Sequence, residues 1–396
     1  MKTLTKTLLA STIAAITFSN GVMAEESNTF TEAMKNGKAS LNFRFRVEDV
    51  SQDGTDDATA QTLRARLNYK TGSFNGFSGF IEFDQVSELI EVDYSTPGNG
   101  RGTATIADPE GTDLNQAYVQ YANAGTTFKY GRQRILLDNQ RYVGGVGWRQ
   151  NEQTFDALSV KNTSIDNLEV FYSYVHNVNT ITGGDIDAKD HLLNAAYKFS
   201  DKAKVTGYGY FLDVTDADNA SDDTLGVRFS GKAAQFTYSA EFARQSARKA
   251  NQPDDYSASY TALKADMKTG PVKIGLGYEV LGADGTEGEF VTKYGTKHAF
   301  NGWSDKFLVT PAGGLKDLYA SVSGKFGGVT AAAIYHTFSA DDSTAAGGID
   351  DFGSELDFVV KGKAGSVGWL VKYANYSADD LATDTSKIWL MASTKF

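Results

Sequence analysis

The feature that most constrains this chain is a two-residue period that returns from residue 41 to the last residue. Its first instance alternates Leu41, Phe43, Phe45 and Val47 with polar or charged residues. Alternation of this kind is typical of a β-strand with one apolar and one polar face. The pattern predicts an all-β protein. We expect eighteen strands, near residues 41–47, 63–69, 77–84, 116–121, 127–135, 154–161, 168–174, 193–199, 204–212, 225–229, 236–242, 257–267, 272–278, 318–322, 329–336, 356–360, 367–373 and 387–396.

The connections between these segments alternate in length. Short ones, such as 70–76 and 268–271, are followed by longer and mostly acidic ones, such as 86–113 and 281–316. All five prolines fall in connections, as expected when the strands need their backbone donors. This layout is typical of an outer-membrane barrel. We therefore predict a single antiparallel transmembrane β-barrel of about 18 strands, with short periplasmic turns and long extracellular loops.

A soluble sandwich of sheets would also alternate apolar and polar residues. Eighteen strands of that kind would need several packed sheets or domains, yet no linker or change of composition divides the chain. In a membrane barrel one closed sheet uses every strand, because the apolar face meets lipid and the polar face meets the lumen. The barrel is therefore the favoured interpretation.

The first residues have the layout of a secretory signal peptide. Lys2 and Lys6 precede an apolar stretch at 8–18, and "GVMA" ends at Ala24. The alternative is an ordinary N-terminal helix. We predict cleavage after residue 24, so that 1–24 are a signal peptide and 25–396 form one outer-membrane β-barrel. The chain has no cysteine, so an exported form cannot rely on disulfides.

The last strand ends in Phe396, the terminal residue. A terminal phenylalanine resembles the signal that the barrel assembly machinery of the outer membrane recognises. We expect that machinery, outer-membrane lipid and lipopolysaccharide as partners. The net charge of −11 argues against nucleic acid as a partner.

Arginines gather on the polar face of the first two strands, at positions 44, 46, 64 and 66. An arginine that faces lipid near the bilayer midplane costs about 2–4 kcal/mol, so Arg44, Arg46, Arg64 and Arg66 should face the lumen. Glu82 and Asp84 on the third strand can neutralise only part of their charge. Two roles stay open: attraction of anions into the lumen, or a network of ion pairs that braces the wall. We also place Arg228, Glu241, Lys273 and Glu279 on the inward side.

Several longer segments resemble the alginate-export family of bacterial outer-membrane porins. They are "FRFRVEDV" (43–50), "TLRARLNY" (62–69), "IADPEGTDLNQAYVQY" (106–121), "GRQRILLDNQRYVGGVGWRQNEQTFDA" (131–157) and "HAFNGWSDKFLVTPAGGLKDLY" (298–319). The resemblance covers nearly all of the mature chain. It implies an eighteen-stranded barrel that passes small polar, anionic or sugar-acid-like solutes through an arginine-lined lumen.

The resemblance also implies an alternative function, export of an anionic polysaccharide such as alginate. Exporters in the family carry an extended periplasmic loop, whereas every second connection of this chain is short. This difference favours a passive diffusion porin. A barrel enzyme or an adhesin is the less favoured class, because the four histidines are scattered and match no hydrolase motif.

Two loops are candidates for a constriction of the lumen. Arg132, Arg134, Arg141 and Arg149 belong to the 131–157 segment, which either folds inward or forms an ion-paired rim. His298, Trp303 and Lys306 belong to the 298–319 segment, whose aromatics either contact sugar rings or pack on the rim. We predict no cofactor and no metal site, since the acidic residues at 213–223 lack the pattern of a calcium loop.

Overall fold

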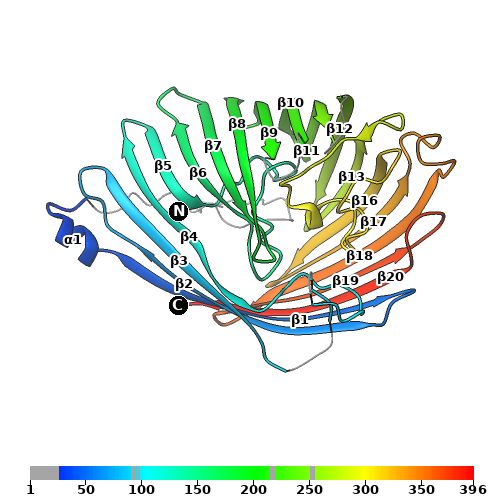
Figure 1. The fold of residues 1–396 in the computed structure, drawn as a ribbon, viewed down its shortest axis with the longest axis horizontal. Coiled ribbons are helices and arrows are strands. Elements are labelled where there is room, and N and C mark those ends of the chain that lie inside the picture. The colour runs from blue at the N-terminus through cyan, green and yellow to red at the C-terminus, as the bar shows by residue number, and fades with distance from the viewer. Residues whose placement is uncertain (1–25, 91–93, 97–98, 215–219, 250–254) are drawn as a thin grey trace.

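Eighteen strands form one antiparallel sheet that closes on itself, because β1 pairs with both β2 and the last strand, β20. The computed structural model describes residues 26–90, 94–96, 99–214, 220–249 and 255–396. The predicted signal peptide lies outside them. The prediction of an eighteen-stranded antiparallel barrel is confirmed (Figure 1).

The elements follow one another around the barrel in chain order. The strands of the barrel are β1 (Lys38–Gln52), β2 (Ala58–Lys70), β3 (Phe77–Glu88), β4 (Gly111–Asn123), β5 (Thr126–Gln133), β6 (Thr154–Asn162), β7 (Leu168–Asn179), β8 (Asp185–Ser200), β9 (Ala203–Val214), β10 (Ala220–Ala233), β11 (Phe236–Arg248), β12 (Tyr256–Thr269), β13 (Val272–Leu281), β16 (Leu315–Phe326), β17 (Val329–Ser339), β18 (Asp351–Ala364), β19 (Val367–Ser377) and β20 (Thr385–Lys395). The small elements are the helix α1 (Phe30–Lys35), the hairpin of β14 (Ala283–Asp284) and β15 (Gly288–Glu289), and the 3-10 turn η1 (Lys297–Ala299).

The two faces of the sheet differ as the alternation requires. Leu67 is 51% exposed on the outside, whereas its neighbour Arg66 is 8% exposed on the inside. The outer face carries exposed apolar side chains on strands all around the barrel, including Phe83 on β3 and Leu390 on β20. Such a band is costly in water but suited to the hydrocarbon of a membrane. Among the described residues, no helix is long and apolar enough to cross a bilayer.

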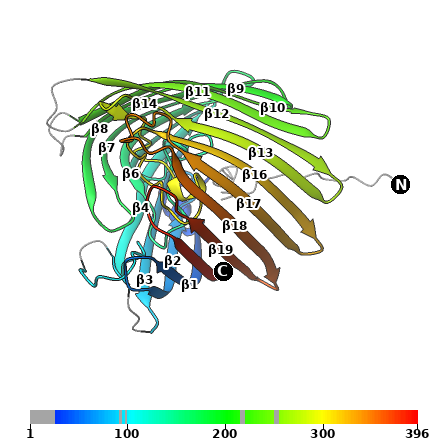
Figure 2. The same cartoon turned by 90° about the vertical axis from the view of Figure 1, so that its right-hand side faces the viewer.

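The two ends of the barrel differ in their connections. At one end, the short-turn rim, neighbouring strands are joined by two to six residues, from 71–76 to 365–366. The β4–β5 turn there consists of Ala124 and Gly125 alone, both with positive φ, as a tight hairpin requires. At the other end, the long-loop rim, β5 and β6 are joined by 134–153, and β13 and β16 by 282–314. Figure 2 shows the short turns gathered at one end of the barrel.

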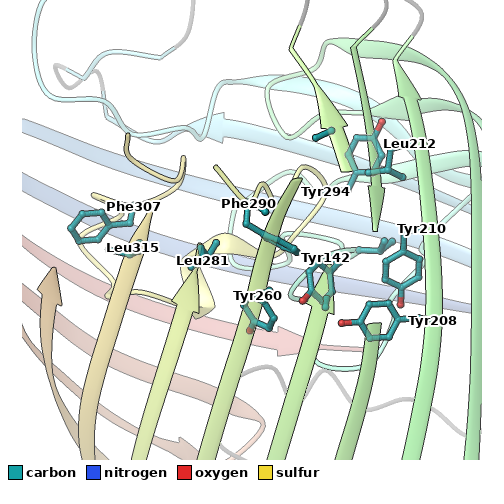
Figure 3. Close-up of a cluster of buried hydrophobic side chains, with 14 of the residues drawn as sticks. Tyr142, Tyr208, Tyr210, Leu212, Tyr260, Leu281, Phe290, Tyr294, Phe307 and Leu315 are labelled. Atoms are coloured by element: carbon teal, nitrogen blue, oxygen red, sulfur yellow. The ribbon is translucent and has the colours of Figure 1, made fainter. Parts of the chain in front are cut away.

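The apolar core lies inside the barrel, between its wall and these two loops. Tyr142 of the 134–153 loop packs on Tyr208, Tyr260 and Phe290, with ring centroids 5.3–5.9 Å apart. Figure 3 shows this cluster where strands and loops meet. The core therefore forms between a wall and inserted loops, instead of between two sheets.

The last residue lies at the short-turn rim beside the first strand. Phe396 exchanges backbone hydrogen bonds with Leu41 and contacts Phe43 edge-on, with ring centroids 6.4 Å apart. Its side chain remains 73% exposed. The end of the chain thus presents an accessible aromatic ring at the closure of the barrel.

Candidate functional site

The 134–153 loop crosses the inside of the barrel and lies on β1 and β2. Arg44 donates from Nε to Gln150 Oε1 at 2.8 Å and from Nη1 to the Gly147 carbonyl at 2.9 Å. Arg64 Nη1 donates to the Gln150 carbonyl at 3.1 Å. These guanidinium groups, fixed forks of several donors, therefore hold the backbone of the loop against the wall.

A third loop, which joins β3 and β4, contributes Asp108 to the same contact. Arg46 Nη1 lies 3.0 Å from Asp108 Oδ2, and the guanidinium lies over the Trp148 ring at 4.4 Å. The backbone N–H of Gln150 donates to Asp108 Oδ1 at 2.6 Å. Burial alone would raise the pKa of Asp108, but Arg46 and Arg149 lower it below its usual range. Asp108 is therefore ionised, and it links the β3–β4 loop both to the 134–153 loop and to β1.

Glu152 joins the loop to β2 and to the end of β5. Its Oε1 accepts from Arg66 Nη1 at 2.6 Å, and its Oε2 accepts from Arg134 Nε. Arg66 also donates twice to Asp84, at 2.6 and 2.5 Å. Arg134 donates to Glu82 as well, at 2.6 Å. Burial opposes ionisation, but the arginines hold the pKa of Glu152 well below its usual range.

Arg149 links the first loop to the second. Its guanidinium pairs with Glu48 on β1 at 2.9 Å and with Asp305 of the 282–314 loop at 3.1 Å. We call the six arginines of this region and their carboxylate partners the arginine network. It consists of Arg44, Arg46, Arg64, Arg66, Arg134 and Arg149 with Glu48, Glu82, Asp84, Asp108, Glu152 and Asp305.

His298 lies between Asp305 and Lys372 of β19. Its Nδ1 is 2.6 Å from Asp305 Oδ1, and its Nε2 is 2.7 Å from Lys372 Nζ. Burial lowers the pKa of His298 to about 3, so the ring is neutral at physiological pH. Neutral His298 donates from Nδ1 and accepts at Nε2. Trp303 and Trp148 cover the Lys372 ammonium, with ring centroids at 3.7 and 4.2 Å.

Arg141 ties both loops to the opposite wall. It donates from Nε to Glu279 Oε1 on β13 at 2.8 Å, and from Nη2 to Asn301 Oδ1 at 2.7 Å. Asn301 belongs to the 282–314 loop and donates to the same carboxylate. Arg141 is thus a junction of two loops and one strand. Arg141 and the arginine network therefore join the two inserted loops to each other and to the wall, and the joined loops occupy part of the lumen.

Beside the loops lies a cavity of about 590 Å³ against the β8–β17 wall. Arg228, Glu241, Lys273 and Glu279 all line it. All four form ion pairs: Arg228 with Glu241 at 3.5 Å, Lys273 with Asp266 at 3.4 Å, and Glu279 with Arg141 at 2.8 Å. Seven basic and five acidic residues line the cavity altogether, so its walls are polar with a small positive excess.

A second, smaller cavity of about 270 Å³ lies toward the long-loop rim. It is lined by Arg132 and by carboxylate and amide groups such as Asp113 and Asn179. Arg132 is held by Asp156 at 2.9 Å. Among the described residues, no group of three or more histidines and carboxylates is placed to hold a metal ion.

The candidate residues from the sequence occupy two different environments. Arg44, Arg46, Arg64 and Arg66 lie on the inner face but are covered by the 134–153 loop, and Glu82 and Asp84 share that site. Arg228, Glu241, Lys273 and Glu279 border the open cavity. The anion-binding role of these residues stays a prediction. Sequence reasoning paired the arginines only with Glu82 and Asp84, and therefore underestimated their neutralisation by Glu48, Asp108 and Glu152.

Both loop segments have residues inside the barrel, whereas their role as a constriction stays a prediction. Arg141, Arg149, His298 and Trp303 are buried inside the barrel. Lys306 reaches Gln52 Oε1 of β1 at 2.9 Å. Sequence reasoning missed Lys372 altogether. A lone lysine on the inward side of "VGWLVKYA" was the available signal, but nothing near it in the sequence indicated its histidine and tryptophan partners.

Comparison with known proteins gives a family and a fold. The family model described as "Alginate export" matches residues 35–284. No curated protein sequence matches the chain significantly. A crystal structure of Pseudomonas aeruginosa OpdK with vanillate is similar at 14% identity and TM-score 0.70, over 91% of this chain and 98% of that one.

Two further crystal structures show the same likeness. OccK9 (OpdG) of Pseudomonas aeruginosa aligns at 15% identity and TM-score 0.72, over 92% of this chain and 99% of that one. OccAB1 of Acinetobacter baumannii aligns at 16% identity and TM-score 0.68, over 95% of this chain and 99% of that one. At these identities the likeness concerns the fold.

Proposed function

Because this chain belongs to the alginate-export family, we propose that it is an outer-membrane channel for passive diffusion of small polar solutes, above all anionic ones. The observation that carries the proposal is the pair of inserted loops, which leaves a cavity of about 590 Å³ beside them. A space of that size suits a small solute. Its polar, slightly basic lining supports a preference for sugar acids and other small carboxylates.

The outer-membrane location is supported by the exposed apolar band and by the fold. We propose that residues 1–24 direct export, that the short-turn rim faces the periplasm, and that exposed Phe396 is read by the assembly machinery. Lipid and lipopolysaccharide would then surround the barrel. OpdK, a fold relative, was crystallised with vanillate, a small carboxylate, which is compatible with the proposed solute class.

Of the two roles considered for the arginines, the contacts favour the brace. Each guanidinium of the arginine network donates to loop carbonyls or carboxylates, and the network contains six arginines and six carboxylates. We therefore assign the anion preference to groups that remain open to solvent, beginning with Arg228 and Lys273 of the cavity wall.

The test is uptake by proteoliposomes that contain the purified barrel. We expect galacturonate to enter faster than galactose, and a long polygalacturonate to be excluded by the inserted loops. Liposomes without protein are the control. Faster entry of galactose would contradict the anion preference. Passage of the polymer would favour the alternative, polysaccharide export, which the family description suggests.

A further inference from the structure

The inner face of the short-turn rim is rich in lysine. Within the four residues of each strand nearest this rim, the inward positions hold thirteen lysines and two carboxylates, Glu169 and Asp266. We call these lysines the lysine ring. They are Lys38, Lys70, Lys129, Lys161, Lys198, Lys204, Lys232, Lys268, Lys273, Lys325, Lys361, Lys363 and Lys395.

The inward direction of the ring follows from the two-residue period of the strands. Lys129 lies between Phe128 and Tyr130, both exposed on the outer face. Lys198 lies likewise between Tyr197 and Phe199. Successive side chains of a strand point to opposite faces, so the lysines face the mouth of the barrel. Four of them, Lys198, Lys204, Lys232 and Lys273, also line the main cavity.

Little in the protein neutralises the ring. Lys161 pairs with Glu169 at 2.6 Å, Lys273 with Asp266 at 3.4 Å and Lys204 with Asp138 at 3.8 Å. Among the described residues, several ring members form no ion pair, and most of these are exposed. They are Lys198, Lys232, Lys268, Lys325, Lys361, Lys363 and Lys395.

The opposite rim has the reverse charge. In the four strand residues nearest the long-loop rim, counted over both faces of the sheet, there are twelve carboxylates and four basic residues. The positive charge is therefore a property of one mouth of a chain whose net charge is −11. Eighteen strands spaced about 4.8 Å apart and tilted about 40° give a circumference of roughly 110 Å.

At that circumference the ring lysines stand on average about 8–9 Å apart. This spacing is close to the Debye length of about 8 Å at physiological ionic strength, so the potentials of neighbouring ammonium groups add. A monovalent anion meets this potential with one charge. An anion with several charges can contact several lysines at once, which multiplies its attraction.

From this arrangement we propose that the short-turn mouth is a binding site for multivalent anions, either oligomeric carboxylates or polyphosphates. The inference rests on the proposed channel function and adds a site that is separate from the constriction. Bound anions occupy the mouth and obstruct the current of small ions. The effect is one-sided, because the long-loop mouth carries the opposite charge.

Planar-bilayer recording tests the proposal. Inositol hexakisphosphate and trigalacturonate serve as probes, with maltotriose and monovalent glucuronate as controls. A single biotinylated cysteine at Thr55→Cys identifies the chamber that the long-loop rim faces, through streptavidin, since the chain has no cysteine of its own. Both probes, added at the short-turn side, should reduce the current at concentrations at least tenfold below those needed at the other side.

The ring variant K232Q/K268Q/K325Q/K361Q should weaken this block at least tenfold. A matched control, K189Q/R244Q/R248Q/K249Q, removes four charges from the long-loop rim and should change the block less than twofold. Block by only one probe supports the site and identifies its anion class. Equal block from both sides, or equal block of the ring variant and the wild type, overturns the proposal.

Calorimetric titration of the detergent-solubilised barrel with inositol hexakisphosphate separates this proposal from the channel function. Binding that is lost in the ring variant supports the site even in a barrel that conducts no ions. A conducting barrel whose binding is the same in the wild type and the ring variant overturns the site and leaves the channel function standing.

Discussion

The arginine network and the lysine ring carry the same charge on the same inner face, but their surroundings differ. On β1, Arg44 and Arg46 are buried under a loop, whereas Lys38 at the rim end of the strand is exposed. The guanidinium is a rigid fork that remains charged and pairs well in a buried site, whereas the lysine ammonium is strongly hydrated and mobile. Charge on an inner wall therefore predicts a filter only where the charged group stays open to the lumen.

The largest expected effect is on the arginine network. Glu152→Ala removes the loop carboxylate that Arg66 and Arg134 share, so that only carboxylates of β3 remain beside them, and breaking a buried pair costs about 3–5 kcal/mol. We expect release of the 134–153 loop and a severalfold rise in conductance. Denaturant unfolding and single-channel recording measure the two effects. The control is Glu287→Ala, which removes an exposed carboxylate; equal behaviour of the two variants would contradict the brace.

A smaller loss of stability is expected when the pH is lowered. The pKa of His298 is lowered to about 3, from about 6.5 when unfolded, so the unfolded chain binds more protons between these values. Neutral His298 contributes fully to the free energy of unfolding above about pH 6.5, and this contribution is lost as the pH falls toward 3. At pH 5 the loss is about 2 kcal/mol, at 1.36 kcal/mol for each pKa unit.

His298→Asn should remove this acid sensitivity, because asparagine does not titrate. The measurement is the free energy of unfolding at pH 7 and pH 5 for the wild type and the variant. His191→Asn, on the exposed outer face, is the control and should keep the wild-type slope. An unchanged slope in the His298 variant would mean that the ring is not neutral in the folded barrel.

The smallest expected effect tests the comparison directly. Arg64→Gln with Arg66→Gln removes two charges that loops cover, whereas K325Q/K361Q removes two from the lysine ring. Reversal potentials across a salt gradient report the anion preference of each variant. We expect the lysine pair to shift the selectivity toward cations more than the arginine pair, and more so at low ionic strength. The reverse order would make the arginines the filter.

Most of the fold could be predicted from the sequence, because membrane and lumen impose opposite chemistry on alternate residues. Strand ends were less predictable. β8 begins at Asp185, although the apolar alternation starts only at Leu193, since Asp187, Lys189 and His191 occupy its outward positions near the rim. The apolar residues of that segment, such as Ala188 and Leu192, lie on the inward face instead, so the pattern changes face at Leu193 whereas the backbone pairing continues.

The site was predictable only in part. The arginines and the loop segments that hold them were identified, because charges inside an alternating pattern are conspicuous. Apart from Glu82 and Asp84, their partners were not identified, because Asp108 and Glu48 are 60 residues apart in sequence and meet through Arg46 and Arg149. The lysine ring was visible in the sequence but was spread over twelve strands, one or two residues each. Only a closed barrel reveals it as one surface.

The pairing of β1 with β20 has a consequence for the order of events in folding. β1, the first strand of the chain, cannot pair with β20 until β20 has been synthesised. The sheet therefore keeps two unpaired edge strands until the end of synthesis. Contacts between distant parts of a chain form slowly, because a long loop must close before they form. The 282–314 loop contacts both strands of this closing pair from inside the barrel. Lys306 donates to Gln52 of β1, and Asp305 accepts from Lys387 of β20. The loops that narrow the passage therefore also fasten the closure, and their docking belongs to the last stage of assembly.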